Sequence, residues 1–183
     1  MSNGERRLKA RIMDKDAMLR AIRRLAHEIT EKNSGLENTV VVGILRRGAR
    51  LAELLGEELF RIEGVRVPVG SIDITYYRDD LSKVSVQPVV NGTDIPFDIN
   101  GKNVILVDDV IYTGRTVRAA IDGLFRKGRP GKVQLLVMID RGLRELPFKP
   151  DFVGKNIPTS HSEVVAVKLE SVDGENSVEI YEV

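Results

Sequence analysis

The sequence predicts an α/β domain built on a mainly parallel, twisted sheet flanked by helices. Residues 40–44 and 104–107 are apolar runs of the kind seen in parallel strands that are buried on both faces. Amphipathic helical patterns alternate with such runs along the chain, as in βαβ units. With 183 residues and 42% hydrophobic content, the chain suffices for one compact domain over residues 1–183.

The predicted elements follow one another in a simple order. A helix begins near residues 14–16 and ends near the Asn-Ser-Gly sequence at 33–35, and its apolar residues recur at helical spacing. These residues are Met18, Leu19, Ile22, Leu25, Ala26 and Ile29. The strand at 40–44 then leads through a turn into a second helix at about 49–60. Further strands are expected near 67–74, 104–107, 133–139 and 152–153, with a helix near 116–127.

A polar stretch at about 75–92 interrupts this alternation. A loop of this length within a compact domain is usually functional, so we predict a flexible loop that closes over a bound ligand. A disordered surface hairpin is the alternative interpretation of the same residues.

Composition excludes several classes of protein. The chain has no cysteine, which rules out disulfides, thiol nucleophiles and cysteine-based metal sites. It has no apolar run long enough for a bilayer span or a signal peptide, so we expect a cytoplasmic protein without a membrane partner.

The net charge of +1 conceals an uneven distribution. Residues 1–35 carry nine Lys and Arg against five Asp and Glu, and residues 126–155 carry eight against three. The segment after Ser162 carries one against six. A basic face of this kind suits an anionic macromolecule, although solvated helix surface is the simpler interpretation of charge alone.

The most informative segment is 104–116, in which four apolar residues run into Asp108 and Asp109 and then a turn rich in Gly and Thr. Ligands of open α/β sheets bind at the carboxyl ends of strands, and a helix N-terminus with unpaired N–H groups attracts phosphate. The segment lacks the spacing of a P-loop and of a dinucleotide fingerprint. Two carboxylates beside a monophosphate cradle therefore predict a ribose 5-phosphate site.

This segment resembles the 5-phosphoribosyl-1-diphosphate (PRPP) motif of type I phosphoribosyltransferases. The resemblance implies the fold of that family, with a small hood and a flexible loop. It also implies that Asp108 and Asp109 hold the ribose hydroxyls. The residues that would wrap the 5-phosphate are Val110, Ile111, Tyr112, Thr113, Gly114, Arg115 and Thr116. A buried strand followed by a capped helix is the alternative, and it leaves the adjacent acids unexplained.

Further family features concern the leaving group. Arg46, Arg47 and Gly48 occupy the place of the diphosphate-binding loop, and Arg78 is a candidate diphosphate contact in the flexible loop. The expected catalytic residues are Asp108, Asp109 and Arg47. The resemblance implies that Mg²⁺ enters with PRPP near the two aspartates, without a dedicated cage of protein ligands.

The C-terminal third narrows the resemblance. Residues 139–147 and 154–160 are similar to the base-binding hood of pyrimidine operon attenuators that are also uracil phosphoribosyltransferases. The hood would comprise about 138–165 with the N-terminal segment. Uracil would then lie against Met138, Ile139 and Arg141, and its edge would be read largely by backbone groups. Asp140 would position Arg141 or a nearby amide. Purine-using relatives have an acid where this chain has Tyr112, which favours a pyrimidine base.

The resemblance also implies regulation of transcription attenuation in pyrimidine metabolism, through UMP-strengthened binding of the operon's leader mRNA. Homodimers or homotetramers are expected. The residues assigned to RNA binding are Arg20, Arg23, Arg24, His27, Arg144, Lys149 and Lys155. A packed or capping role is the alternative for His27.

Three positions depart from the family pattern. Leu143 replaces a usual histidine, Arg46 a usual threonine and His161 a usual Arg or Lys. Two hypotheses therefore remain: an active enzyme that also regulates, and an RNA-binding attenuator whose vestigial enzymatic site serves as a PRPP and UMP sensor. A purine phosphoribosyltransferase is disfavoured by Tyr112 and by the hood.

Overall fold

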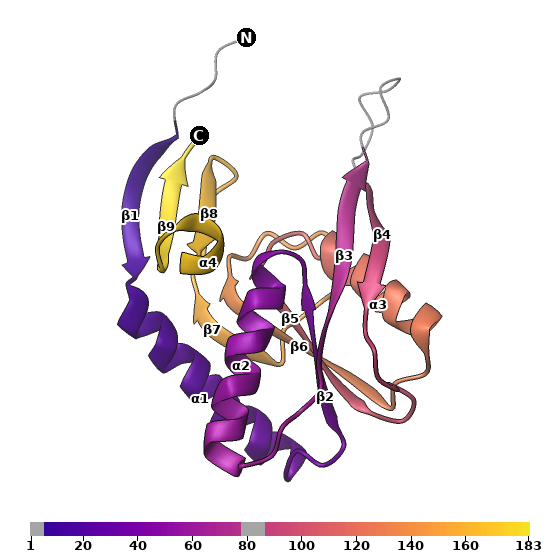
Figure 1. Cartoon of the computed structure of the whole chain (residues 1–183). Helices are drawn as coiled ribbons and strands as arrows, with labels where there is room; N and C mark the ends of the chain where they lie inside the picture. The colour runs from indigo at the N-terminus through magenta and orange to yellow at the C-terminus, as the bar shows by residue number, and fades with distance from the viewer. Residues whose placement is uncertain (1–5, 78–86) are drawn as a thin grey trace.

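The computed structural model describes residues 6–77 and 87–183, which form two sheets and four helices (Figure 1). In the larger sheet all neighbouring strands are parallel except β4, which pairs antiparallel at one edge. The predicted α/β class with a mainly parallel sheet is confirmed. The strand order is β4 (Gln87–Asp94), β3 (Val69–Tyr77), β2 (Thr39–Ile44), β5 (Asn103–Ile111), β6 (Lys132–Asp140) and β7 (Phe152–Asn156).

Helices cover both faces of this sheet. On one face α1 (Lys15–Asn33) and α2 (Arg47–Glu63) pack on Val41 and Ile105, and on the other α3 (Arg115–Lys127) packs on Val42 and Leu106. Successive residues of a strand point to opposite faces, so a central strand with a core on each side must be apolar throughout. This requirement explains the unbroken apolar runs in β2 and β5.

The first helix follows its sequence pattern closely. Asp14 caps it by accepting a hydrogen bond from the Ala17 backbone N–H at 2.8 Å, and Ser34 ends it in the left-handed region with φ 54°. Leu19 is the exception among the predicted apolar positions. It lies at the edge of the buried stripe and is 39% exposed.

Several boundaries differ from the predictions. α2 begins at Arg47 instead of about residue 49, and β5 continues to Ile111. The prediction that Asp108 and Asp109 follow the strand was therefore wrong, because the parallel ladder with β6 continues past both acids.

The predicted loop at 75–92 was wrong at both ends. β3 continues to Tyr77 and pairs with β4, so the stems belong to the hairpin that was the alternative interpretation. The polar residues of this stretch can still form paired strands, because one side of a hairpin at the edge of a sheet can face water. Residues 78–86, including the diphosphate candidate Arg78, lie outside the described residues.

A small sheet joins the two ends of the described chain (Figure 1). It consists of β1 (Arg7–Met13), β9 (Ser177–Glu182) and β8 (Glu163–Lys168), with α4 (Glu170–Asp173) between β8 and β9. The sequence did not predict these strands. The hood was expected from about 138–165 together with the N-terminal segment. This expectation includes β1 and the first half of β8, whereas the second half of β8, α4 and β9 lie beyond residue 165.

Glu179 of β9 links the strands of the small sheet through buried charge. Its side chain is 2% exposed and lies 2.8 Å from both Arg11 Nη2 and Lys168 Nζ. Hydrogen bonds from Lys168 and Tyr181 lower the pKa of Glu179 to about 2. Because the folded pKa lies below the ordinary value of 4.5, its contribution to stability is complete above about pH 4.5. That contribution is lost as the pH falls toward 2.

We expect Glu179→Gln to lower the free energy of unfolding at pH 7 by about 2 kcal/mol, the size of lost hydrogen bonds to a charged group. Denaturant melts at pH 7 and pH 3 measure it, and the difference between variant and parent should shrink at pH 3. Glu175→Gln is the matched control, because Glu175 pairs with the same Arg11 and Lys168 but is 41% exposed. Equal losses in the two variants would contradict the role assigned to burial.

Candidate active site

Four segments meet at the carboxyl edge of the large sheet. They are the acid pair near the end of β5, the turn from β2 into α2, the turn into α3 and the segment that follows β6. Since β2, β5 and β6 are parallel neighbours, their carboxyl ends lie side by side. This edge is where open α/β sheets bind their ligands.

The acid pair is held by its own backbone. Asp108 is 7% exposed, and its Oδ1 accepts a hydrogen bond from the Asp109 N–H at 2.9 Å. Asp109 Oδ1 accepts from the Val110 N–H at the same distance. Burial raises the pKa of Asp108 well above its ordinary value, and the charge of Asp109 raises it further. Burial also raises the pKa of Asp109, opposed by the Asp108 hydrogen bond and the charge of Arg47.

The raised pKa of Asp108 has a consequence for stability. A carboxyl with a folded pKa above its unfolded value destabilises the fold once the pH passes the unfolded value, because its charged form is then buried. We expect Asp108→Asn to stabilise the protein at pH 7 by roughly 1 kcal/mol, as when strain at a functional site is removed. The gain should vanish below about pH 4, where the parent carboxyl is protonated in both states. Thermal melts across this range measure it, and a variant that is less stable at pH 7 would contradict the assignment.

The N-terminus of α2 packs directly on the acid strand. A Cβ added to Gly48 would lie 2.5 Å from the Val107 carbonyl oxygen and 3.1 Å from the Asp108 Cα, so this position requires glycine. The contact brings the neighbouring Arg47 close enough to Asp109 for each charge to shift the pKa of the other. Arg46 is exposed at the start of the helix. The structure thus brings the predicted diphosphate loop to the predicted ribose site.

The turn into α3 forms a pocket of about 170 Å³. Gly114 caps the helix with φ 93°, and the Thr113 carbonyl accepts hydrogen bonds from the backbone N–H groups of Glu145 and Leu146, each at 3.0 Å. These bonds hold the turn open toward the acid pair. The residues that line the pocket are Asp108, Val110, Ile111, Tyr112, Thr113, Gly114, Thr116, Val117 and Arg141.

Asp109 was predicted to bind PRPP but does not line this pocket. Arg115 does not line it either. Its backbone N–H was expected to be free, but it donates to the Thr113 hydroxyl at 3.3 Å, a local turn bond common for threonine. Its side chain forms an ion pair with Glu145 at 2.7 Å.

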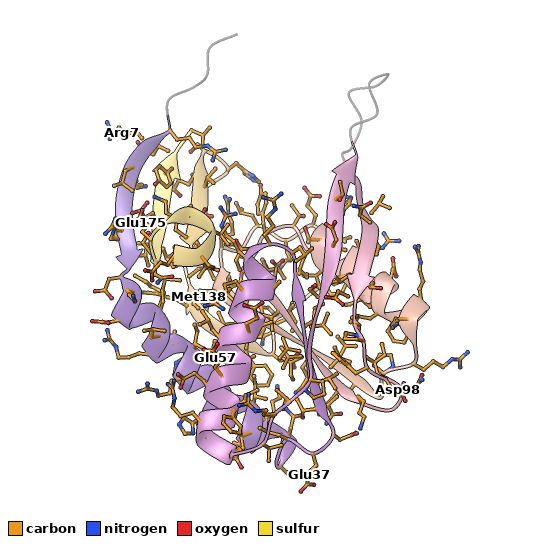
Figure 2. The ribbon with its side chains drawn as sticks, in the orientation of Figure 1. Arg7, Glu37, Glu57, Asp98, Met138 and Glu175 are labelled. Atoms are coloured by element: carbon orange, nitrogen blue, oxygen red, sulfur yellow. The ribbon has the colours of Figure 1, made fainter. Side chains whose placement is uncertain are left out.

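Two of the residues predicted for the base lie at the end of β6. Met138 and Ile139 are 1% and 0% exposed, and the Met138 side chain lies in the interior near the middle of the molecule (Figure 2). Both side chains fill the core between the sheet and the helices, so they offer no surface to a base. Recognition of the ring edge by backbone groups of this strand end stays a prediction.

Asp140 positions a nearby amide, because its carboxylate accepts a hydrogen bond from the Gly142 N–H at 2.9 Å. Its charged partner is Arg144 at 2.5 Å rather than Arg141. Arg144 also donates to the carbonyls of Tyr112 and Phe148, at 3.0 and 2.9 Å. This arginine therefore joins the β6 segment to the phosphate turn.

Arg141 is held by contacts within the protein, and its predicted contact with uracil stays a prediction. It is 6% exposed, and it donates to the Thr159 hydroxyl at 2.9 Å and to the carbonyls of Ser160 and Glu163 at 3.0 and 2.7 Å. Its guanidinium stacks 4.2 Å from the centre of the Tyr112 ring. Arg141 thus fixes the phosphate turn against the segment that leads into the small sheet.

A second, open pocket of about 430 Å³ adjoins the first, with Arg141 in the wall of both. Leu143 lines this second pocket. Its backbone φ of 56° lies in the left-handed region, which is rare for leucine and more frequent for histidine. The sequence did not single out Asn156, Pro158 and Thr159, which come from the segment after β7. The full lining is Asp140, Arg141, Gly142, Leu143, Arg144, Asn156, Pro158 and Thr159.

His161, another departure from the family pattern, lies beside this pair of pockets. Its Nδ1 is 3.3 Å from the Tyr112 hydroxyl. A polar contact to the phosphate turn therefore forms at the position where the resemblance implied an Arg or Lys.

The residues assigned to RNA binding occupy two environments. Arg20, His27, Lys149 and Lys155 are exposed, which excludes the packed alternative for His27. Arg24 donates to the carbonyls of Val153 and Gly154 at 3.1 and 2.7 Å, so it fixes α1 beside β7 and Lys155.

The remaining two assigned arginines have partners within the protein. Arg23, whose side chain is 57% exposed, pairs with the buried Glu58 of α2 at 3.3 Å, and Arg144 is held at the phosphate turn as described above. We define the α1–β7 basic surface as Arg20, Arg24, His27 and Lys155.

Within 6–77 and 87–183, no group of three or more His, Asp and Glu side chains is arranged to hold a metal ion. None of the helices in these ranges is both long and apolar enough to cross a bilayer.

Comparisons with known proteins place this site in a family. Residues 10–172 match the family model described as phosphoribosyl transferase domain. The chain is 59% identical over 175 residues to the "Bifunctional protein PyrR" of Acetivibrio thermocellus, covering 96% of this chain and 95% of that protein. It is 57% identical to the protein of the same name from Pelotomaculum thermopropionicum, covering 96% and 97%.

Among solved structures, a hypoxanthine phosphoribosyltransferase from Trypanosoma cruzi superimposes with a TM-score of 0.76. The two chains are 21% identical, and 96% of each is covered. At this identity the comparison establishes the fold alone.

Proposed function

Because the chain belongs to the phosphoribosyltransferase family, and within it to the bifunctional PyrR proteins, we propose that it makes UMP from uracil and PRPP and regulates the pyrimidine operon by binding leader mRNA. One observation carries the enzymatic part. A phosphate-sized pocket lined by the buried Asp108 opens beside a larger pocket, and Arg141 lies in the wall of both. Such a pair suits a ribose phosphate next to a base.

In the proposed reaction, the bond from ribose C1 to diphosphate breaks, the bond from C1 to a uracil nitrogen forms, and that nitrogen loses its proton. Positive charge develops at C1 while negative charge grows on the leaving group. Asp108 and Asp109 hold the ribose hydroxyls, and Arg46, Arg47 and the amide of Gly48 receive the diphosphate. Catalysis then consists mainly of positioning and electrostatic stabilisation by groups that are already in place.

The residues present fit a Mg²⁺ ion that arrives with PRPP. The neighbouring carboxylates supply the oxygen donors that Mg²⁺ prefers, but too few for a cage of protein ligands alone. A bound ion would neutralise charge on the diphosphate. Burial raises the pKa values of Asp108 and Asp109, and a cation held by them would favour their charged forms.

The base pocket favours uracil through its shape and its backbone. Asp140 and Arg144 use their polar atoms to hold the 140–144 segment, so peptide groups of this segment are left to read the edge of the ring. Tyr112 is committed to stacking on Arg141, and no acid stands at that position to assist a purine nitrogen.

The test supplies PRPP and Mg²⁺ with uracil, hypoxanthine or orotate in separate reactions and measures nucleotide formation. UMP formation with uracil alone is the expected result. Formation of the hypoxanthine nucleotide would refute the base assignment.

The regulatory part rests on the α1–β7 basic surface. Arg20 and Lys155 are exposed on adjoining elements, and neutralised RNA phosphates would supply much of the affinity. Since leader transcripts are made in the cytoplasm, we place the protein there, as a homodimer or homotetramer.

The second candidate function is an attenuator that senses PRPP and UMP with little turnover. UMP-strengthened RNA binding with only trace UMP formation would favour it, and the strained Leu143 in the base pocket motivates it.

A further inference from the structure

We propose that Asp173, in the helical turn of the small sheet, is a positioning residue for Arg47 and so determines how well the protein receives diphosphate. The proposal rests on the proposed function, in which Arg47 binds the leaving group. It concerns a residue 126 positions away along the chain, in a segment with no part in the PRPP motif.

The geometry of the ion pair is specific. Arg47 Nε lies 3.1 Å from Asp173 Oδ2, and Arg47 Nη2 lies 2.6 Å from Asp173 Oδ1. Two parallel bonds between planar groups fix the plane and direction of the guanidinium, as one bond would not. They use two of the five N–H donors of arginine, so three remain for phosphate oxygens.

Asp173 is itself held in place. Its Oδ2 also accepts the Leu169 N–H at 2.9 Å, and its own N–H donates to the Leu169 carbonyl at 2.6 Å. The same turn is fixed at Glu170, which pairs with Lys15 of α1 at 3.1 Å and accepts from Asn176 at 3.2 Å. The carboxylate that orients Arg47 therefore sits on a turn anchored to both its own sheet and α1.

The position of this pair favours a role in ligand binding over one in stability. Arg47 stays 41% exposed and Asp173 18%, and ion pairs of such exposure contribute little to stability. Arg47 nevertheless stands close enough to Asp109 to lower the pKa of that carboxyl. A fixed guanidinium beside the ribose acids is already oriented when PRPP arrives, so less entropy is lost on binding.

The test compares Asp173→Asn with the control Glu170→Gln. Asparagine keeps an acceptor for the Leu169 N–H but lacks the charge, and the control removes an ion pair from the same turn without touching Arg47. We expect Asp173→Asn to raise KM for PRPP and Kd for magnesium diphosphate by about tenfold, as for one lost charged hydrogen bond. KM for uracil and the melting temperature should stay near the parent values, and Glu170→Gln should match the parent throughout.

A double-mutant cycle isolates the action through Arg47. In an Arg47→Ala background, Asp173→Asn should have no further effect on diphosphate binding. An equal loss in both backgrounds, a change confined to the melting temperature, or tighter diphosphate binding by Asp173→Asn would each overturn the proposal. Calorimetry with magnesium diphosphate needs no turnover, so absent UMP formation would refute the proposed function while this binding comparison still decides the role of Asp173.

Discussion

Asp109→Asn is expected to reduce kcat/KM for PRPP by about 10³-fold, the upper range for removing one preorganised electrostatic contact. The carboxylate of Asp109 is oriented by the Val110 N–H and lies near the positive charge of Arg47. Asparagine has a similar size but cannot offer two anionic acceptors to the ribose hydroxyls and the Mg²⁺ that accompanies PRPP. Initial rates of UMP formation at varied PRPP measure the effect.

The same variant should leave RNA binding without nucleotide unchanged, because the α1–β7 basic surface shares no residue with the acid pair. Asp73→Asn is a suitable control, since Asp73 is an acid on β3 whose described partner is Asn91. If the Asp109 variant made UMP at the parent rate, the assignment of residues 104–116 to PRPP would fail.

Arg20→Ala combined with Lys155→Ala is expected to weaken binding of the leader RNA by at least about tenfold while UMP formation stays at the parent rate. Both side chains are exposed, and Arg24 fixes their two elements side by side. Each cation that contacts a phosphate contributes about one to the slope of log affinity against log salt, so the slope should fall by about 2. Titrations of labelled RNA with UMP at several salt concentrations give both quantities.

Arg126→Ala with Lys127→Ala supplies the matched control, because it removes two exposed cations from α3 on the opposite face of the large sheet. A similar loss in this control would mean that the effect reflects net charge. Loss of turnover together with RNA affinity in the Arg20 and Lys155 variant would show that the two surfaces are not separate.

Sequence patterns predicted the elements whose structure is determined by residues close to them in the chain. A central strand with a core on each face must be apolar throughout, and a helix start needs a cap, so β5, α1 and the turn into α3 were evident in the sequence. The partners of Arg47 and Asp140 were not evident in the sequence. Asp173 lies 126 residues from Arg47, and both Arg141 and Arg144 are close enough in sequence to pair with Asp140. Which of these side-chain pairs forms depends on the finished fold.

The small sheet was missed for a related reason. β1 has the sequence Arg-Leu-Lys-Ala-Arg-Ile-Met, and its three cations are typical of a solvated segment. In the fold these cations pair with Glu163, Glu179 and Glu182, which are distant in the sequence. Likewise, Met138 and Ile139 stand in a motif that the resemblance assigns to the base, but their burial depends on helices and strands elsewhere in the chain. A resemblance identifies a segment and does not say which way its side chains point.

The pairing of β1 with β9 has a consequence for how the protein is made. Arg7 pairs with Glu182, so a ribosome must synthesise almost every residue between them before the first strand can find its partner. Contacts this distant along the chain form late in folding. The large sheet and its acid pair can therefore assemble on the nascent chain, whereas the turn that carries Asp173 is set in place only after synthesis has passed β9. A newly made molecule should therefore acquire its fully oriented Arg47 only when β1 and β9 pair.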